Sequence, residues 1–256
     1  MGKVFVITSG KGGVGKTTSA INLGAAINSY DENVIVVDAN LTTPNVGLHL
    51  GAPIVPVTLN HVLREEANVE DAIYRHESGT KIIPADLSIK EIGKLRFDKI
   101  KDVADTLREY ADYVVFDSPA GLGEDALSVL KSGDEIIVVT HPEIPAVTDA
   151  LKTIKMAEEH GKKIKGVILN RVRMADTEMP LFSVKEMLEY PVLGMIPDDK
   201  NMQKALSRRD AILHTHPSSK ASRAYKKIAA KLIGKEHLYK ETFSEKLLRG
   251  LGLDYS

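Results

Sequence analysis

Seven short apolar runs constrain the fold of this chain more than any other feature of its sequence. They are "KVFVIT", "NVIVVD", "TKIIPA", "DYVVFD", "DEIIVVT", "KIKGVILN" and "PVLGMIP". Each run is rich in β-branched residues and nearly continuous in apolar character, which is typical of strands that are covered on both faces. We therefore expect seven strands in a sheet that has helices on both sides.

Segments with helical spacing lie between most of these runs. They span residues 17–30, 98–110, 144–160, 199–206 and 218–233. Strands that alternate with helices predict an α/β fold of three layers, with a mostly parallel, twisted sheet and right-handed crossovers. In such folds, ligands bind at the carboxyl ends of the strands. We expect one domain over residues 1–235, followed by a short tail over residues 236–256.

Composition narrows the classes of function. With 256 residues, of which 43% are apolar, the chain is long enough to bury a substantial core. The absence of cysteine excludes disulfides and cysteine-ligated iron–sulfur clusters. A net charge of -1 means that DNA or anionic lipid would have to be met by a local patch. We find no signal peptide and no run of about 18 apolar residues, so we expect a cytoplasmic protein.

The stretch "SGKGGVGKTT", residues 9–18, follows the first predicted strand and opens the first predicted helix. It matches G-x-x-x-x-G-K-[ST], the phosphate-binding loop of the P-loop NTPase fold. Backbone N–H groups of such a loop converge on phosphate oxygens, Lys16 neutralises the β- and γ-phosphates, and the Thr17 hydroxyl ligates Mg²⁺. The alternative is an ordinary glycine-rich turn. The predicted nucleotide-binding residues here are Gly10, Lys11, Gly12, Gly13, Val14, Gly15, Lys16, Thr17 and Thr18.

Asp117 ends the fourth apolar run and is followed by "SPAG". An apolar strand that ends in aspartate is the Walker B signature, and its carboxylate is a second candidate ligand for Mg²⁺. A helix cap or a turn residue is the alternative for an isolated aspartate. The phosphate-binding loop elsewhere in the chain favours the metal site.

At these motifs the chain resembles a known family. "KGGVGKTT" resembles the deviant Walker A motif of the MinD/ParA class of P-loop ATPases. "DSPAGL" and "THPEIPAVTDALK" are similar to the second switch and the following helix of the septum site-determining MinD proteins, archaeal ones among them. The resemblance extends from residue 3 to about residue 233. It implies ATP and Mg²⁺ as ligands and a slow ATPase that dimerisation or a partner stimulates.

The resemblance gives the first lysine of the loop a separate role. In this family that lysine reaches across an ATP-held homodimer to the nucleotide of the partner, and the matching residue is Lys11. A cation supplied by the partner makes catalysis conditional on dimerisation, because charge develops on the phosphoryl group that is transferred. The alternative is an exposed lysine without a task.

The second run and the residues after it read "VVDANLTTPN", and here the sequence departs from the family pattern. Asp38 stands at the family's first switch aspartate and is a candidate for the magnesium shell. Asn40 stands where the family commonly has the carboxylate that orients the attacking water. An amide holds a water but has no useful basicity, so we expect slow hydrolysis. A strand-end turn is the alternative for both residues.

The resemblance also suggests where the adenine binds. Asn170 ends the sixth run and Arg171 follows it, and the family offers an asparagine amide to the ring at this place. The "IPDD" loop, with Pro197 and Asp199, is expected to close the base pocket. Guanine is disfavoured because no aspartate follows in the N-K-x-D arrangement. A plain strand-end asparagine is the alternative.

The tail carries an amphipathic pattern. Thr242 and Glu245 have capping-box spacing at its start. Its apolar side projects Phe243, Leu247, Leu248 and Leu251. The stretch resembles the membrane-targeting tail of MinD proteins, which implies peripheral binding to the inner face of the cell membrane. A final helix that packs on the domain or on a subunit interface is the alternative.

We therefore expect a MinD-like ATPase that dimerises with ATP, associates reversibly with the membrane and positions a cell-division or other assembly. The sequence does not specify a regulatory protein partner. One alternative is a ParA-type DNA partition protein, for which the basic stretches "SRR" and "YKKIAAKLIGK" are candidates, although near-zero net charge makes DNA the less favoured partner. A non-catalytic ATP-sensing scaffold is the other, because of Asn40.

Overall fold

The computed structural model describes residues 1–52, 54–88 and 92–241. Within them, one sheet has the strand order β3-β4-β2-β5-β1-β6-β7-β8. Neighbouring strands are parallel except β3 and β4, which are antiparallel. The strands are β1 (Lys3–Thr8), β2 (Val34–Asp38), β3 (Tyr74–Arg75), β4 (Lys81–Ile83), β5 (Tyr113–Asp117), β6 (Glu135–Thr140), β7 (Lys163–Val172) and β8 (Val192–Pro197).

This architecture confirms the predicted α/β fold with a mostly parallel sheet. Each of the seven apolar runs forms a strand. The sequence did not predict β3, because it is a two-residue edge strand with an exposed Arg75 and therefore has no continuous apolar pattern.

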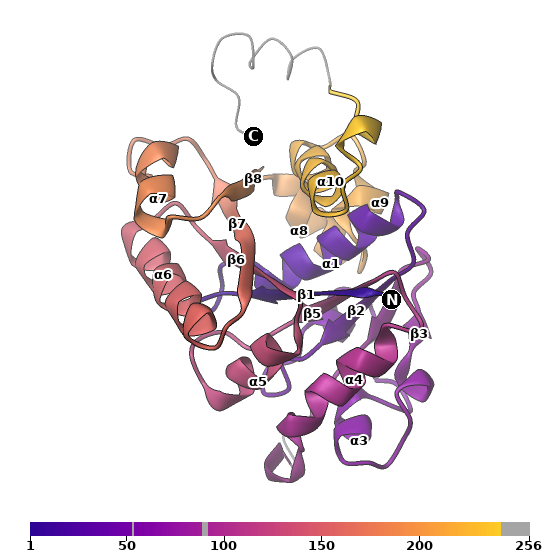
Figure 1. Ribbon diagram of the computed structural model, residues 1–256. Helices are drawn as coiled ribbons and strands as arrows, with labels where there is room; N and C mark the ends of the chain where they lie inside the picture. Colours follow the sequence, from indigo (N-terminus) through magenta and orange to yellow (C-terminus); the bar gives the residue numbers. More distant parts are fainter. Residues whose placement is uncertain (53, 89–91, 242–256) are drawn as a thin grey trace.

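Helices cover both faces of the sheet (Figure 1). The α-helices are α1 (Lys16–Asn28), α2 (Val46–His49), α3 (Leu59–Leu63), α4 (Ile100–Leu107), α5 (Glu124–Ser132), α6 (Ile144–Glu159), α7 (Leu181–Leu188), α8 (Lys200–Ser207), α9 (Ile212–Thr215) and α10 (Lys220–Leu232). The 3₁₀ turns are η1 (Glu70–Ala72), η2 (Ile92–Lys94), η3 (Phe97–Lys99) and η4 (Glu236–Leu238). All five predicted helical segments contain a helix, whereas α5 and α7 were not among the predicted segments.

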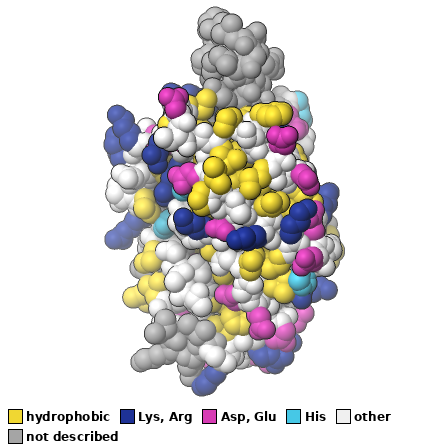
Figure 2. All heavy atoms as spheres, turned by 90° about the vertical axis from the view of Figure 1, so that its left-hand side faces the viewer, with side chains coloured by type: hydrophobic (Ala, Val, Ile, Leu, Met, Phe, Trp, Pro, Cys, Tyr) yellow, Lys and Arg dark blue, Asp and Glu magenta, His cyan; other side chains and the backbone are white. Residues whose placement is uncertain are grey.

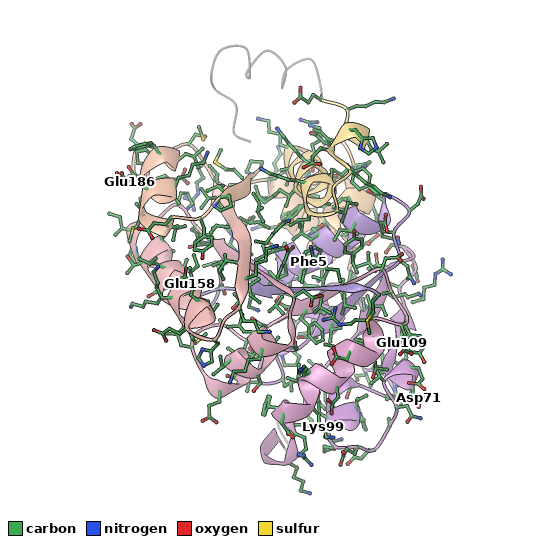
Figure 3. All side chains as sticks on the ribbon, viewed as in Figure 1. Phe5, Asp71, Lys99, Glu109, Glu158 and Glu186 are labelled. Atoms are coloured by element: carbon green, nitrogen blue, oxygen red, sulfur yellow. The ribbon has the colours of Figure 1, made fainter. Side chains whose placement is uncertain are left out.

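Alternate residues of each central strand enter two separate hydrophobic cores. Val4 and Val6 of β1 pack with residues of α4, α5, α6 and α7. Phe5 and Ile7 of the same strand pack with residues of α1 and α10. Figure 3 shows Phe5 at the centre of the molecule, whereas the labelled charged residues lie at its periphery. The two-sided burial explains why the apolar runs are nearly continuous.

The outer surface mixes side chains of all kinds. On the side where α6 and α7 lie in Figure 1, hydrophobic side chains gather between charged ones of both signs (Figure 2). Ile144 of α6 and Phe182 of α7 are exposed hydrophobic residues on these helices. Among the residues described, no helix is long and apolar enough to span a membrane.

Close contact between α1 and β2 gives a test of this packing. A Cβ added to Gly24 would lie 2.4 Å from Val36 Cγ2. Alanine in place of glycine would favour an exposed helix by about 1 kcal/mol. At this buried position we expect Gly24→Ala instead to lower the free energy of unfolding, by about 1–3 kcal/mol, because the core is overpacked. Urea unfolding measures this.

Gly93→Ala is the matched control, since no heavy atom lies within 4 Å of a Cβ added there. Equal effects of the two substitutions would contradict the close packing of α1 on β2.

Candidate functional site

The carboxyl ends of three adjacent strands form the centre of the candidate site. β5 lies between β2 and β1 in the sheet, and the register aligns Asp117 with both Asp38 and Ile7. The phosphate-binding loop follows β1, and α1 begins at Lys16 after Gly15, whose φ of 91° is in the left-handed region. Parallel pairing thus brings the loop and both aspartates to the same edge of the sheet.

The Asp117 carboxylate accepts hydrogen bonds from two residues of the phosphate-binding motif. Lys16 Nζ donates to Asp117 Oδ1 at 2.8 Å, and Thr17 Oγ1 donates to Asp117 Oδ2 at 2.5 Å. Lys16 and Asp117 are both buried. A hydroxyl beside buried carboxylates is the hard oxygen donor set that Mg²⁺ prefers. The residues predicted for phosphate and metal therefore lie together in a cluster that fits a magnesium ion.

Asp38 is fully buried at the end of β2. Its Oδ2 accepts the backbone N–H groups of Asn45 and Val46, each at 2.8 Å, and its Oδ1 accepts that of Asn40 at 3.2 Å. Burial raises the pKa of Asp38 to about 7, and the charge of Asp117 adds to the rise, while the backbone N–H groups of Val46 and Asn45 and the charge of Lys16 oppose it. A cation at this place would stabilise the ionised carboxylate.

The amide of Asn40 is engaged in a local turn. Its Nδ2 donates to the carbonyl oxygen of Thr43 at 2.8 Å, and the Thr43 hydroxyl lies 2.9 Å from the same nitrogen. Asn40 nevertheless lines a cavity of 390 Å³ together with Lys16 and Thr17. Hydrogen bonds thus hold the side chain at the phosphate end of the site. The amide offers no basic group there.

Lys11 is exposed on the loop. Its carbonyl oxygen accepts the Ser9 hydroxyl at 3.0 Å, and its ammonium forms no hydrogen bond or ion pair with the residues that the structure describes. The loop is braced against α6, because a Cβ added to Gly10 would lie 2.1 Å from the carbonyl oxygen of Asp149. Both readings of Lys11, a residue aimed at a partner and an exposed lysine, agree with this placement.

A second cavity of 600 Å³ adjoins the phosphate end and contains the predicted base-binding residues. Asn170 Nδ2 donates to the carbonyl oxygen of Val14 at 2.7 Å, and a Cβ on Gly15 would lie 2.1 Å from that nitrogen. The amide nitrogen therefore supports the phosphate-binding loop. Asn170, Arg171, Pro197 and Asp199 all line the cavity.

Asp199 connects the wall of this cavity to two helices. Its Oδ1 accepts the backbone N–H of Asn201 at 2.9 Å and so caps α8. Its Oδ2 accepts the backbone N–H of Ala221 in the first turn of α10 at 3.3 Å. Farther along α10, the hydroxyl of Tyr225 lies 3.2 Å from that of Ser19 in α1.

Several lining residues carry no motif that the sequence analysis could use. Thr43 and Asn45 line the phosphate end, and Met202 and Leu206 line the base end. His49 lines both cavities. It belongs to α2, a helix of four residues, which is too short to be predicted by its spacing.

The proposed membrane residues lie outside the described part of the chain. The capping residue Thr242 lies outside it. So do the apolar residues of the tail, which are Phe243, Leu247, Leu248 and Leu251.

Comparisons with known proteins agree with this geometry. The ParA family model, described as NUBPL iron-transfer P-loop NTPase, matches residues 1–233. The chain belongs to the ParA/MinD family of P-loop NTPases. An uncharacterized ATP-binding protein of Methanocaldococcus jannaschii is 37% identical over 98% of this chain and 97% of its own length. The resemblance to the MinD/ParA class that the motifs indicated is thereby confirmed.

Solved structures of MinD share the fold. The cell division ATPase MinD of Pyrococcus furiosus is 35% identical, with a TM-score of 0.87 over 91% of this chain and 99% of that structure. The septum site-determining protein MinD of Pyrococcus horikoshii, solved in a complex with Mg-ADP, is 32% identical, with a TM-score of 0.88 over 94% of this chain and all (100%) of that structure.

The iron-transfer description of the matching family model does not suit this member. A cysteine-ligated cluster needs thiolates, and the sequence contains no cysteine. Within the ParA/MinD family, the chain therefore belongs with the members that carry no such cluster.

The raised pKa of Asp38 predicts how stability depends on pH in the metal-free protein. Between about pH 4 and pH 7 the folded chain binds a proton at Asp38 that the unfolded chain has released, so the free energy of unfolding falls as the pH rises. The Asp38→Asn variant lacks this titration. Relative to it, we expect the wild type to lose about 1–3 kcal/mol between pH 5 and pH 7.

Urea unfolding of both proteins in a chelator measures the difference, and the groups that titrate alike in both cancel. A constant difference between wild type and Asp38→Asn at the two pH values would show that Asp38 is ionised throughout.

Proposed function

We propose that this protein is a MinD-like ATPase that binds ATP with Mg²⁺ and hydrolyses it slowly. The observation that carries the proposal is the convergence of Lys16 and Thr17 on the single buried carboxylate of Asp117. This arrangement adds a lysine and a metal-binding hydroxyl to a loop whose glycines free its N–H groups for phosphate. Relatives described as ATP-binding, or solved with Mg-ADP, support the nucleotide assignment.

The residues of the cluster divide the work between phosphate and metal. Lys16 leaves Asp117 to neutralise the β- and γ-phosphates, and Thr17, Asp38 and Asp117 hold the metal shell, directly or through water. Bound Mg²⁺ supplies positive charge that offsets the charge developing on the phosphate oxygens. Because the Lys16 ammonium lies 2.8 Å from Asp117, one cation would replace another beside this carboxylate when Lys16 moves to the phosphates.

Hydrolysis is slow in this proposal because Asn40 stands where a carboxylate would activate water. Its amide is held by Thr43 and orients a water without accepting a proton. Transfer of a phosphoryl group through a loose transition state asks little of a base, so turnover is reduced and not abolished.

At the base end, Arg171 and the "IPDD" loop would enclose the adenine. Pro197 and Asp199 belong to the wall of the 600 Å³ cavity. Asn170 contributes its carbonyl oxygen to the adenine amino group, since its amide nitrogen is bonded to Val14.

Dimerisation with ATP would place Lys11 at the partner's nucleotide. Its exposed ammonium, which has no partner within the described chain, supports this role. Two tails on one dimer would then bind the inner face of the membrane together, and such avidity exceeds the affinity of one tail by about 10²- to 10⁴-fold. The protein would thereby position a cell-division or other assembly according to its nucleotide.

Steady-state ATP turnover tests the enzyme assignment. We expect a slow, Mg²⁺-dependent rate in the wild type, and Lys16→Ala should lower it by about 100-fold or more because phosphate charge is no longer neutralised. Asn40→Asp should raise the rate by up to about 100-fold, since it restores a proton acceptor. If the wild type and Lys16→Ala both remain at background with and without lipid, the chain is a sensing scaffold.

Sedimentation with liposomes tests the switch. Wild-type protein should pellet with anionic liposomes in ATP and stay in the supernatant in ADP. Deletion from Thr242 onward should abolish pelleting, because it removes the apolar side of the tail. Lys11→Ala should reduce dimerisation and pelleting by more than it reduces ATP affinity, measured on the same samples.

Lys101→Ala is the matched control for Lys11→Ala, because it removes an exposed lysine of α4 and leaves the loop and α6 intact. Pelleting that ignores the nucleotide or survives the deletion would refute the tail proposal. ATP-dependent pelleting with DNA in place of liposomes would favour the partition function.

A further inference from the structure

The two cavities of the site meet at a neck. Four residues line both cavities, and they are Gly15, Thr18, His49 and Arg171. Gly15 and Thr18 come from the phosphate-binding loop and α1, and Arg171 follows Asn170 on β7. His49 alone among these four comes from α2. Since the phosphates and the base occupy different cavities in the proposed function, the neck is where the ribose and the α-phosphate would pass.

The ring nitrogens of His49 are available to a ligand. It is partly buried, yet among the described residues it forms no hydrogen bond or ion pair. Its backbone N–H is already used within the helix, where it donates to the carbonyl oxygen of Asn45 at 2.9 Å. Neither ring nitrogen is a fully buried atom, so both remain accessible. An imidazole beside a cavity has its ring nitrogens free for whatever enters that cavity.

The opposite end of α2 is fixed to the metal end of the site. The backbone N–H groups of Asn45 and Val46 both donate to Asp38 Oδ2. His49 lies one turn farther along the same helix. The helix therefore contacts the site at two points, one at the predicted metal ligand and the other at the neck.

Arg171 lies on another wall of the neck. Its φ of 53° is in the left-handed region, which is uncommon for a residue other than glycine and is held here at the end of β7. A guanidinium supplies charge to phosphate oxygens, whereas an imidazole with one protonated nitrogen donates to a phosphate or ribose oxygen. Burial lowers the pKa of His49, against the effect of Asp117, and so favours the neutral imidazole.

We propose that His49 contacts the bound nucleotide at its ribose and α-phosphate, and that this contact fixes α2 in the presence of either ADP or ATP. The inference rests on the proposed nucleotide site and adds a residue to it. Switch segments are commonly ordered by the γ-phosphate and its metal. Here the His49 end of the first switch segment instead responds to the part that both nucleotides share.

Equilibrium binding of ADP and of a non-hydrolysable ATP analogue to the full-length protein tests the contact. We expect His49→Ala to weaken both ligands by about tenfold, as for the loss of one hydrogen bond to a charged group. His49→Gln keeps a side-chain N–H donor and should recover part of the affinity. His160→Ala, at the exposed end of α6, is the control and should leave both affinities unchanged.

Amide hydrogen exchange provides the second readout. In the wild type, ADP should slow exchange in α2 and in the residues that follow it. In His49→Ala, ADP at saturating concentration should no longer do so, whereas the ATP analogue with Mg²⁺ should still protect the Asp38 end. A protein that merely lost stability would show faster exchange in every element, including α6 and α10.

The outcomes separate this inference from the proposed function. A wild-type protein that binds neither nucleotide refutes the proposed function. Wild-type binding that His49→Ala leaves unchanged in affinity, with the same protection of α2 by ADP, overturns the role of His49. If His49→Ala does not fold, His49→Gln serves in its place. A loss of affinity smaller than about tenfold then supports the contact, and no loss overturns it.

Discussion

The buried carboxylate of Asp117 is the interaction on which the site depends. Both of its oxygens are occupied, one by the Lys16 ammonium and the other by the Thr17 hydroxyl. These bonds hold the first turn of α1 against the end of β5. A buried charge without a partner is costly, so the loop and the strand stabilise each other. Asp38 adds a second buried carboxylate at the same register position, and a single lysine does not neutralise both.

This imbalance of charge connects the attachment of α2 with the proposed metal site. In the folded chain, burial and the charge of Asp117 favour the protonated form of Asp38, and α2 is attached to that same side chain through its backbone. The loop between β2 and α2, the proposed metal site and the strand ends are therefore one electrostatic unit. Sequence neighbours such as Asn40 and Thr43 satisfy each other's polar groups, which keeps the loop between β2 and α2 compact.

The sequence predicted the elements that repeat a pattern over several residues. The seven apolar runs and the phosphate-binding motif could be identified because each has a characteristic period or spacing. β3 and α2 could not, since two and four residues complete little more than one period. The bond from Asn170 to Val14 joins residues 156 positions apart, so only the fold reveals that this amide supports the loop as well as the cavity. His49 was missed for the same reason, because Thr18 and Arg171, which line the same cavities, lie far from it in the sequence.

The bonds made by Asp199 have a consequence for the far end of the molecule. Through Asp199 the wall of the base cavity is joined to the first turn of α10, and α10 contains 13 residues. A helix of that length is a stiff rod of about 20 Å. Tyr225, which lies against Ser19, is a point on the rod that α1 holds in place. Because α10 also packs on β8 and α1 along its length, a displacement of the cavity wall at Asp199 would be transmitted along the helix toward η4, which follows it in the chain.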